Sequence, residues 1–118
     1  EIESKALADL LRKEKFTSTI SYHTQGEVIY WYFGQGEYVP KARRLAGIVH
    51  KNSSYPVIDY YSPQYAGGFK DFAEQKYQIP SVTIECGKGV SPVPEEQIDK
   101  LWDGQKGILP DLLYDYMG

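Results

Sequence analysis

The sequence predicts an α/β protein in which helices pack on a sheet. Apolar residues recur at helical spacing near both ends of the chain, alternate with polar residues over 16–23, and form a branched and aromatic run over 28–33. Helical and strand patterns then follow one another in the order helix, strand, strand, helix, strand, helix, strand, helix. This alternation is typical of a sheet covered by helices.

The first two predicted elements are a helix and a strand. The spacing of three leucines predicts a short amphipathic helix over residues 4–13. From Phe16 the apolar period changes to two, which predicts a strand that ends at His23. Alternation places His23 on the same face as Ser21 and opposite Tyr22. His23 is therefore expected at the carboxyl end of a strand.

The middle of the chain predicts two strands around a helix. The run 28–33 has the branched and aromatic composition of a buried strand. Pro40 suits the first turn of a helix, whose apolar spacing continues to Val49. A short strand is expected over 57–61.

The last third of the chain begins with a loop over 62–68, which contains a proline and paired glycines. A helix is expected over 69–76 and a strand over 81–86. Apolar spacing then predicts a terminal helix over 98–116, which two glycines and a proline should kink or split. The chain shows no repeat and no low-complexity linker, so it predicts one domain or part of one.

Composition restricts the classes of partner. The formal charge is -3, from 13 basic and 16 acidic residues, which provides no field for holding a polyanion, so nucleic acid is not expected. The longest apolar stretches are far shorter than the roughly 20 residues of a membrane helix, and no membrane partner is expected. Cys86 is the single cysteine, which excludes an intramolecular disulfide and a cysteine-based zinc finger.

Glu85 and His23 are the candidate functional residues that the pattern itself indicates. Glu85 stands in a strand that otherwise predicts burial, where an unpaired carboxylate is costly. It could point to solvent, pair with a lysine, or have a chemical role, and His23 could equally be a hydrogen-bonded structural residue. Both lie at carboxyl ends of strands, where open α/β sheets place their sites. We therefore expect the two side chains to meet in one cleft.

Other reactive side chains fit structural roles better. His50 is expected near the last turn of a helix, where imidazole suits the carbonyl end of the helix dipole. Cys86 should face away from Glu85 and act as a small core residue. The eleven tyrosines are explained mainly by packing, except those near the Gly67-Gly68 pair.

Three segments are specific enough to resemble a known family. They are ISYHTQGEVIYW over 20–31, YAGGFKDF over 65–72 and PSVTIECGKGV over 80–90. In this order they resemble segments of bacterial zinc carboxypeptidase-family enzymes, particularly the γ-D-glutamyl-L-diamino acid endopeptidases. The resemblance covers nearly all of this chain but only the later part of the family's domain. It implies part of a mixed-sheet zinc carboxypeptidase-like fold.

The resemblance also implies roles for individual residues. His23 matches a zinc ligand, and Glu85 matches the general base for zinc-activated water. Tyr65 matches the mobile tyrosine that hydrogen-bonds substrate, and Tyr61 lies close enough in sequence to be a second candidate for substrate contact. Lys70 falls where related carboxypeptidases keep a specificity-pocket residue, so it could meet a substrate carboxylate. A solvent-exposed helix lysine is the alternative for Lys70.

The family's first two zinc ligands come from a His-x-x-Glu motif, which this sequence lacks. We expect that motif upstream of Glu1, so residues 1–118 would be the C-terminal part of one catalytic domain. One histidine cannot hold a catalytic zinc ion, so this chain alone should be inactive. The expected activity of the intact protein is hydrolysis of the γ-D-glutamyl–diamino acid bond of cell-wall peptides. This substrate class suggests a cell-envelope or secreted location, and a cytoplasmic location is the alternative. A C-terminal exopeptidase and a non-catalytic cell-wall peptide-binding module are the alternatives, and the cut sheet edge could form a homodimer.

Overall fold

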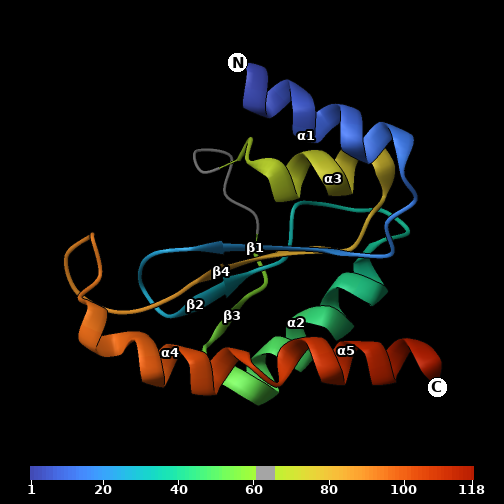
Figure 1. The fold of residues 1–118 in the computed structure, drawn as a ribbon. Helices are drawn as coiled ribbons and strands as arrows, with labels where there is room; N and C mark the ends of the chain where they lie inside the picture. Colours follow the sequence, from blue (N-terminus) through green and yellow to red (C-terminus); the bar gives the residue numbers. More distant parts are fainter. Residues whose placement is uncertain (61–65) are drawn as a thin grey trace.

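The computed structural model describes residues 1–60 and 66–118, which form a four-stranded sheet with helices on both faces. Figure 1 shows α1 (Ile2–Lys13) and α3 (Phe69–Tyr77) on one side of the sheet. On the other side lie α2 (Val39–Ser53), α4 (Ile98–Gln105) and α5 (Ile108–Met117). The α/β class predicted from the sequence is therefore confirmed.

The sheet contains parallel and antiparallel neighbours in the order β1-β4-β2-β3. Its strands are β1 (Thr19–His23), β2 (Val28–Tyr30), β3 (Val57–Ile58) and β4 (Ser81–Glu85). β1 is parallel to β4 and β2 is parallel to β3, while β2 and β4 are antiparallel. Because β1 and β4 are neighbouring parallel strands, their carboxyl ends lie side by side. His23, the last residue of β1, is the register partner of Glu85, the last residue of β4.

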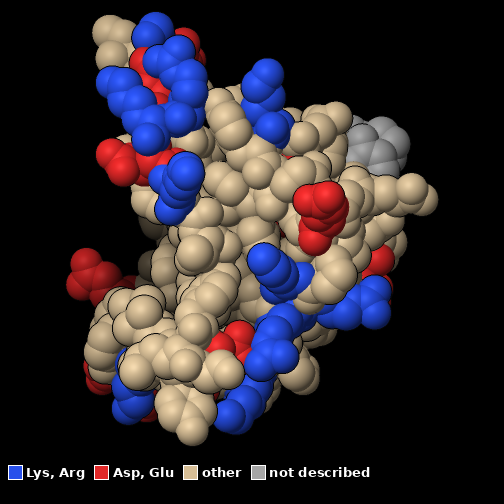
Figure 2. Space-filling model, turned by 90° about the vertical axis from the view of Figure 1, so that its right-hand side faces the viewer, with Lys and Arg blue, Asp and Glu red and all other residues tan. Residues whose placement is uncertain are grey.

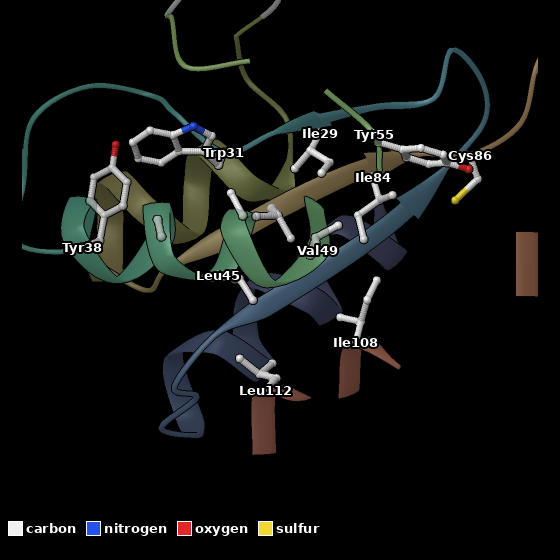
Figure 3. Close-up of a cluster of buried hydrophobic side chains, with 13 residues drawn as sticks. Ile29, Trp31, Tyr38, Leu45, Val49, Tyr55, Ile84, Cys86, Ile108 and Leu112 are labelled. Atoms are coloured by element: carbon white, nitrogen blue, oxygen red, sulfur yellow. The ribbon is translucent and has the colours of Figure 1, made fainter. Parts of the chain in front are cut away.

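The larger core lies between the sheet and the helices α2 and α5. Alternate residues of β2 and β4 face this core, and α2 and α5 supply its opposite wall (Figure 3). The fully or nearly fully buried apolar side chains there include Ile29, Trp31, Leu45, Val49, Val82, Ile84, Ile108 and Leu112.

A smaller core lies on the other face, where Leu11 of α1, Ala73 of α3 and Ile79 pack together. α3 contacts both β1 and β4. In β4, Val82 and Ile84 face the larger core. The residues that alternate with them, Thr83 and Glu85, therefore face the side of the sheet that carries α3.

The strands are shorter than the sequence predicts. The run expected over 28–33 leaves the sheet after Tyr30, because the N–H groups of Phe33 and Gly34 donate to the Tyr38 hydroxyl at 3.3 and 3.0 Å. The prediction that this run is buried throughout is wrong for Tyr30, which is exposed. The strand predicted from Phe16 begins at Thr19, and the one predicted over 57–61 covers Val57–Ile58 among the described residues.

The helix predictions hold more closely. α1, α2 and α3 each coincide with a predicted helix and extend it by one to a few residues. The terminal helix is split, as expected, into α4 and α5, and the short 3₁₀ helix η2 (Glu95–Gln97) precedes it. No helix in the described part of the chain is both long and apolar enough to cross a bilayer.

Candidate metal and substrate site

A cleft of about 380 Å³ opens on the sheet face that carries α3. All four strands and α3 contribute to it, so it collects residues from both halves of the sequence. The described residues that line it are His23, Tyr30, Tyr32, Ile58, Tyr60, Ala66, Gly68, Lys70, Asp71, Thr83 and Glu85.

His23 and Glu85 lie side by side at one end of this cleft. The Nδ1 atom of His23 is 3.7 Å from Oε1 of Glu85, and the backbone N–H of Cys86 donates to the His23 carbonyl at 2.8 Å. The two side chains differ in exposure, at 61% for His23 and 18% for Glu85. The structure thus brings together the two residues whose meeting the parallel strand ends predict, with an accessible imidazole beside a mostly buried carboxylate.

The surroundings of Glu85 bear on two of its alternative interpretations, exposure to solvent and pairing with a lysine. Its side chain is not freely solvated, and the nearby Lys88 pairs instead with Glu27 at 3.3 Å. The ionisable side chain that lies beside Glu85 is the imidazole of His23. Glu85 therefore lines the cleft without a lysine partner among the described residues.

The described part of the chain places one possible metal ligand in the cleft. His23 offers one accessible nitrogen ligand of the kind that zinc prefers. No group of three His, Cys, Asp or Glu side chains that could hold a metal ion occurs within residues 1–60 and 66–118. The donor set therefore fits one ligand of a zinc site and a carboxylate beside it, and a complete site needs further ligands.

Lys70 lies at the floor of the cleft and is only 8% exposed. Its ammonium donates to Asp71 Oδ1 at 2.5 Å, to Glu74 Oε2 at 3.3 Å and to the Tyr32 carbonyl at 3.3 Å. The alternative of a solvent-exposed helix lysine is therefore wrong, because two carboxylates and a carbonyl compensate for burial of the charge.

Glu74 is a feature of this region that the motif analysis missed. Its side chain is fully buried, and this burial raises its pKa to about 8 against the opposing effect of the Lys70 ammonium. The signal that could have found it is the spacing of Lys70 and Glu74, which are four residues apart on a predicted helix and so lie on one face.

The tyrosines of the site divide into two groups. Tyr61 and Tyr65, the two predicted to contact substrate, lie outside the described residues, so their roles stay predictions. Tyr30, Tyr32 and Tyr60 line the cleft, which the sequence did not predict because each stands in or beside a strand expected to be buried.

His50 and Cys86 have the structural roles expected of them. His50 Nδ1 lies 2.7 Å from the Tyr55 carbonyl, which links the end of α2 to the following turn. Cys86 is buried in the larger core, and this burial raises the pKa of its thiol. Neither residue contributes to the cleft.

Comparisons with known proteins agree with this geometry. The chain is 34% identical over 112 residues to γ-D-glutamyl-L-diamino acid endopeptidase 1 of Lysinibacillus sphaericus. The aligned region covers 95% of this chain and 28% of that protein. It is also 31% identical over 115 residues to the uncharacterized protein YqgT of Bacillus subtilis (strain 168). This aligned region covers 92% of the chain and 29% of YqgT. The chain thus spans less than a third of the length of either relative. Residues 1–106 match the sequence profile of zinc carboxypeptidases, and the chain belongs to the zinc carboxypeptidase family of metallopeptidases.

Proposed function

We propose that the protein carrying this sequence is a zinc-dependent peptidase that cleaves the γ-D-glutamyl–diamino acid bond of cell-wall peptides. One observation carries the proposal: an accessible histidine and a mostly buried glutamate lie 3.7 Å apart in a cleft of a zinc carboxypeptidase-family chain. The choice of bond is supported by the name of the Lysinibacillus relative, which is 34% identical to this chain.

The two central residues take complementary parts in this reaction. His23 would be a zinc ligand, and zinc when bound supplies Lewis acidity that polarises a peptide carbonyl and acidifies water. Glu85 accepts the proton of the attacking water as general base and returns it to the leaving amine as general acid. Its position at the carboxyl end of β4, in the cleft lining, lets its carboxylate reach a peptide bond held in the cleft.

Lys70 supports the same choice of substrate. Lys70 lines the cleft, and an ammonium group suits a carboxylate of an acidic cell-wall stem peptide. Tyr65 is assigned to hydrogen-bond the substrate, with Tyr61 as an additional contact, on the family resemblance of their segment.

The remaining zinc ligands belong elsewhere in the longer protein. A catalytic zinc ion takes three protein ligands, and the described residues supply one histidine for it. We place the other two in a His-x-x-Glu segment N-terminal to Glu1, in keeping with relatives of which this chain spans 28% and 29%. The 118-residue chain by itself is then expected to be inactive.

The proposal is tested by comparing the 118-residue chain with the longer protein that carries it. We expect the longer protein to bind one zinc ion per chain and to cleave a γ-D-glutamyl–diamino acid peptide, while the short chain does neither. Mass spectrometry of the products distinguishes this bond from release of a C-terminal residue. Tight zinc binding and cleavage by the short chain would contradict the placement of the missing ligands, and binding without cleavage by the longer protein would favour a non-catalytic module.

Two variants of the longer protein separate the roles of His23 and Glu85. His23→Ala should lose stoichiometric zinc, whereas His50→Ala, which removes an imidazole outside the cleft, should keep it. Glu85→Gln should keep zinc but lower kcat by about 10²- to 10⁴-fold, the usual contribution of general acid–base catalysis. An unchanged zinc content in His23→Ala, or an unchanged kcat in Glu85→Gln, would refute the corresponding role.

A further inference from the structure

At the floor of the cleft, the ammonium of Lys70 is shared between two carboxylates on the same helix. Nζ lies 2.5 Å from Asp71 Oδ1 and 3.3 Å from Glu74 Oε2. Asp71 is also engaged through its second oxygen, which accepts the Gly67 N–H at 2.8 Å. Lys70 and Asp71 line the cleft, whereas Glu74 lies behind them and is fully buried.

Glu74 is a costly residue for its position. A buried carboxylate needs full compensation, yet Oε1 of Glu74 has no hydrogen-bond partner among the described residues. The contact that the carboxyl makes with the cleft is its hydrogen bond to the Lys70 ammonium.

We propose that Glu74 is a positioning residue that holds the Lys70 ammonium at the cleft floor and that its proton determines how much of that positive charge is available to an acidic substrate group. The inference rests on the proposed function, because it requires an acidic peptide in the cleft. It adds a residue outside the cleft lining that controls the preference for substrate charge.

The electrostatics follow from counting the charged partners of Lys70. When Glu74 is protonated, Lys70 has one charged partner fewer, and a substrate carboxylate can take that place. When Glu74 ionises, two carboxylates already compensate Lys70, and a third anion is repelled. The pKa of Glu74, raised by burial to about 8, places this change just above neutral pH.

The other groups around Glu74 do not reverse this direction. Asp71 on α3 raises the pKa of Glu74, and the Lys70 charge and the backbone amide of Ser81 on β4 lower it. The Tyr38 phenol, which precedes α2, has a pKa raised above its usual value, first by burial and then by the Glu74 charge, so it remains neutral near pH 8.

The test uses the longer enzyme and two peptides that are identical except at one carboxylate, free in one and amidated in the other. For the wild type, KM for the acidic peptide should rise roughly tenfold from pH 7 to pH 9, equivalent to about 1.4 kcal/mol, while KM for the amidated peptide stays constant. Glu74→Gln mimics the protonated form and should keep the low KM for the acidic peptide at every pH. Lys70→Met should remove the preference for the acidic peptide, and Glu96→Gln, at an exposed glutamate, should behave as wild type.

Calorimetric binding of the same two peptides separates failure of this inference from failure of the proposed function. If the wild type cleaves neither peptide but binds the acidic one more tightly below pH 8, and Glu74→Gln abolishes that pH dependence, the proposed function fails and the inference stands. If Glu74→Gln retains the wild-type pH dependence in KM or in binding, or if the wild type shows none, the inference is overturned.

Discussion

Single residues in this protein owe their properties to burial more than to their place in a motif. Glu74 is the clearest case, because its carboxyl belongs to no recognised motif and yet is fully buried beside the cleft. Glu85 is less buried, at 18% exposure, and lies where a bound molecule can reach it. A carboxylate that the fold encloses affects stability, and one that the fold leaves accessible can react.

Burial of Glu74 should make stability depend on pH. Its pKa is about 8 in the folded chain against 4.5 for an ordinary glutamate, so the folded state binds this proton more tightly than the unfolded state. Stability from this group is therefore present below about pH 4.5 and is lost as pH rises to about 8. Relative to wild type, Glu74→Gln should gain on the order of a few kcal/mol in the free energy of unfolding across this range.

Urea unfolding from pH 5 to pH 9 measures this difference. The curves of wild type and Glu74→Gln should converge at the acidic end and separate at the basic end. Glu96→Gln, which changes an exposed glutamate, should follow the wild type throughout. Parallel curves for Glu74→Gln and wild type would show that Glu74 titrates normally.

At the scale of the elements, the turn that follows β4 holds the carboxyl ends of β4 and β1 together beside the cleft. Gly87 has φ +81°, a left-handed conformation that favours glycine, and its N-terminal neighbours are Glu85 and Cys86. The Gly26 N–H donates to the Gly87 carbonyl at 2.8 Å, so this turn is tied to the connection that follows β1. A Cβ at residue 87 would lie 2.7 Å from Val93 Cγ1, which leaves no room for a side chain.

Gly87→Ala should therefore destabilise the chain by roughly 1–3 kcal/mol, from backbone strain and the contact with Val93. Gly104→Ala is the matched control, because Gly104 lies inside α4 and an added Cβ would be in ordinary contact, 3.6 Å from Ser53 Cα. That control should gain about 0.5–1 kcal/mol from helix propensity. Chemical denaturation of the three chains checks both signs, and equal stability of Gly87→Ala and wild type would contradict the strain argument.

At the scale of the whole molecule, the surface carries both signs of charge. Figure 2 shows basic and acidic side chains close together on one face, which accords with a net charge of -3. On α1, Lys5 and Arg12 both pair with Asp9, at 2.7 and 2.9 Å. The more unusual surface features are an edge strand and an apolar helix surface.

Within the described residues the sheet has two edge strands, the two-residue β3 and the longer β1, and β1 pairs with β4 alone. Its free backbone side can add a strand from another chain. The apolar surface runs along α4 and α5, where several large side chains are exposed at helical spacing: Ile98, Trp102, Leu109 and Leu113. We propose that the isolated chain forms a homodimer through the β1 edge.

Light scattering after gel filtration, over a range of concentrations, tests this dimer. Tyr22→Lys places a charge on β1 at a side chain that is 54% exposed and should yield a monomer. Trp102→Lys alters the apolar surface of α4 and should leave the dimer intact. The reverse result would assign the contact to the helices, and a monomeric wild type at high concentration would exclude the dimer.

The fold could be predicted from the sequence as far as local periodicity reaches. Helical and strand periods placed each element within a few residues, and alternation along 81–86 correctly separated Cys86 in the core from Glu85. Strand lengths were less accurate, because the residues after Tyr30 exchange sheet hydrogen bonds for the Tyr38 hydroxyl, which no local pattern indicates.

The sequence by itself determined the α/β class, the family and the strand ends that carry His23 and Glu85. Only the tertiary structure decided that these strands are direct neighbours and that Lys70 is buried against Asp71 and Glu74. The physical reason is how far apart in the sequence the interacting groups lie. Periodicity and side-chain alternation arise from backbone geometry within a few residues. Strand pairing and the burial of a charge depend instead on groups distant in the chain, such as the Tyr32 carbonyl that accepts a hydrogen bond from the Lys70 ammonium.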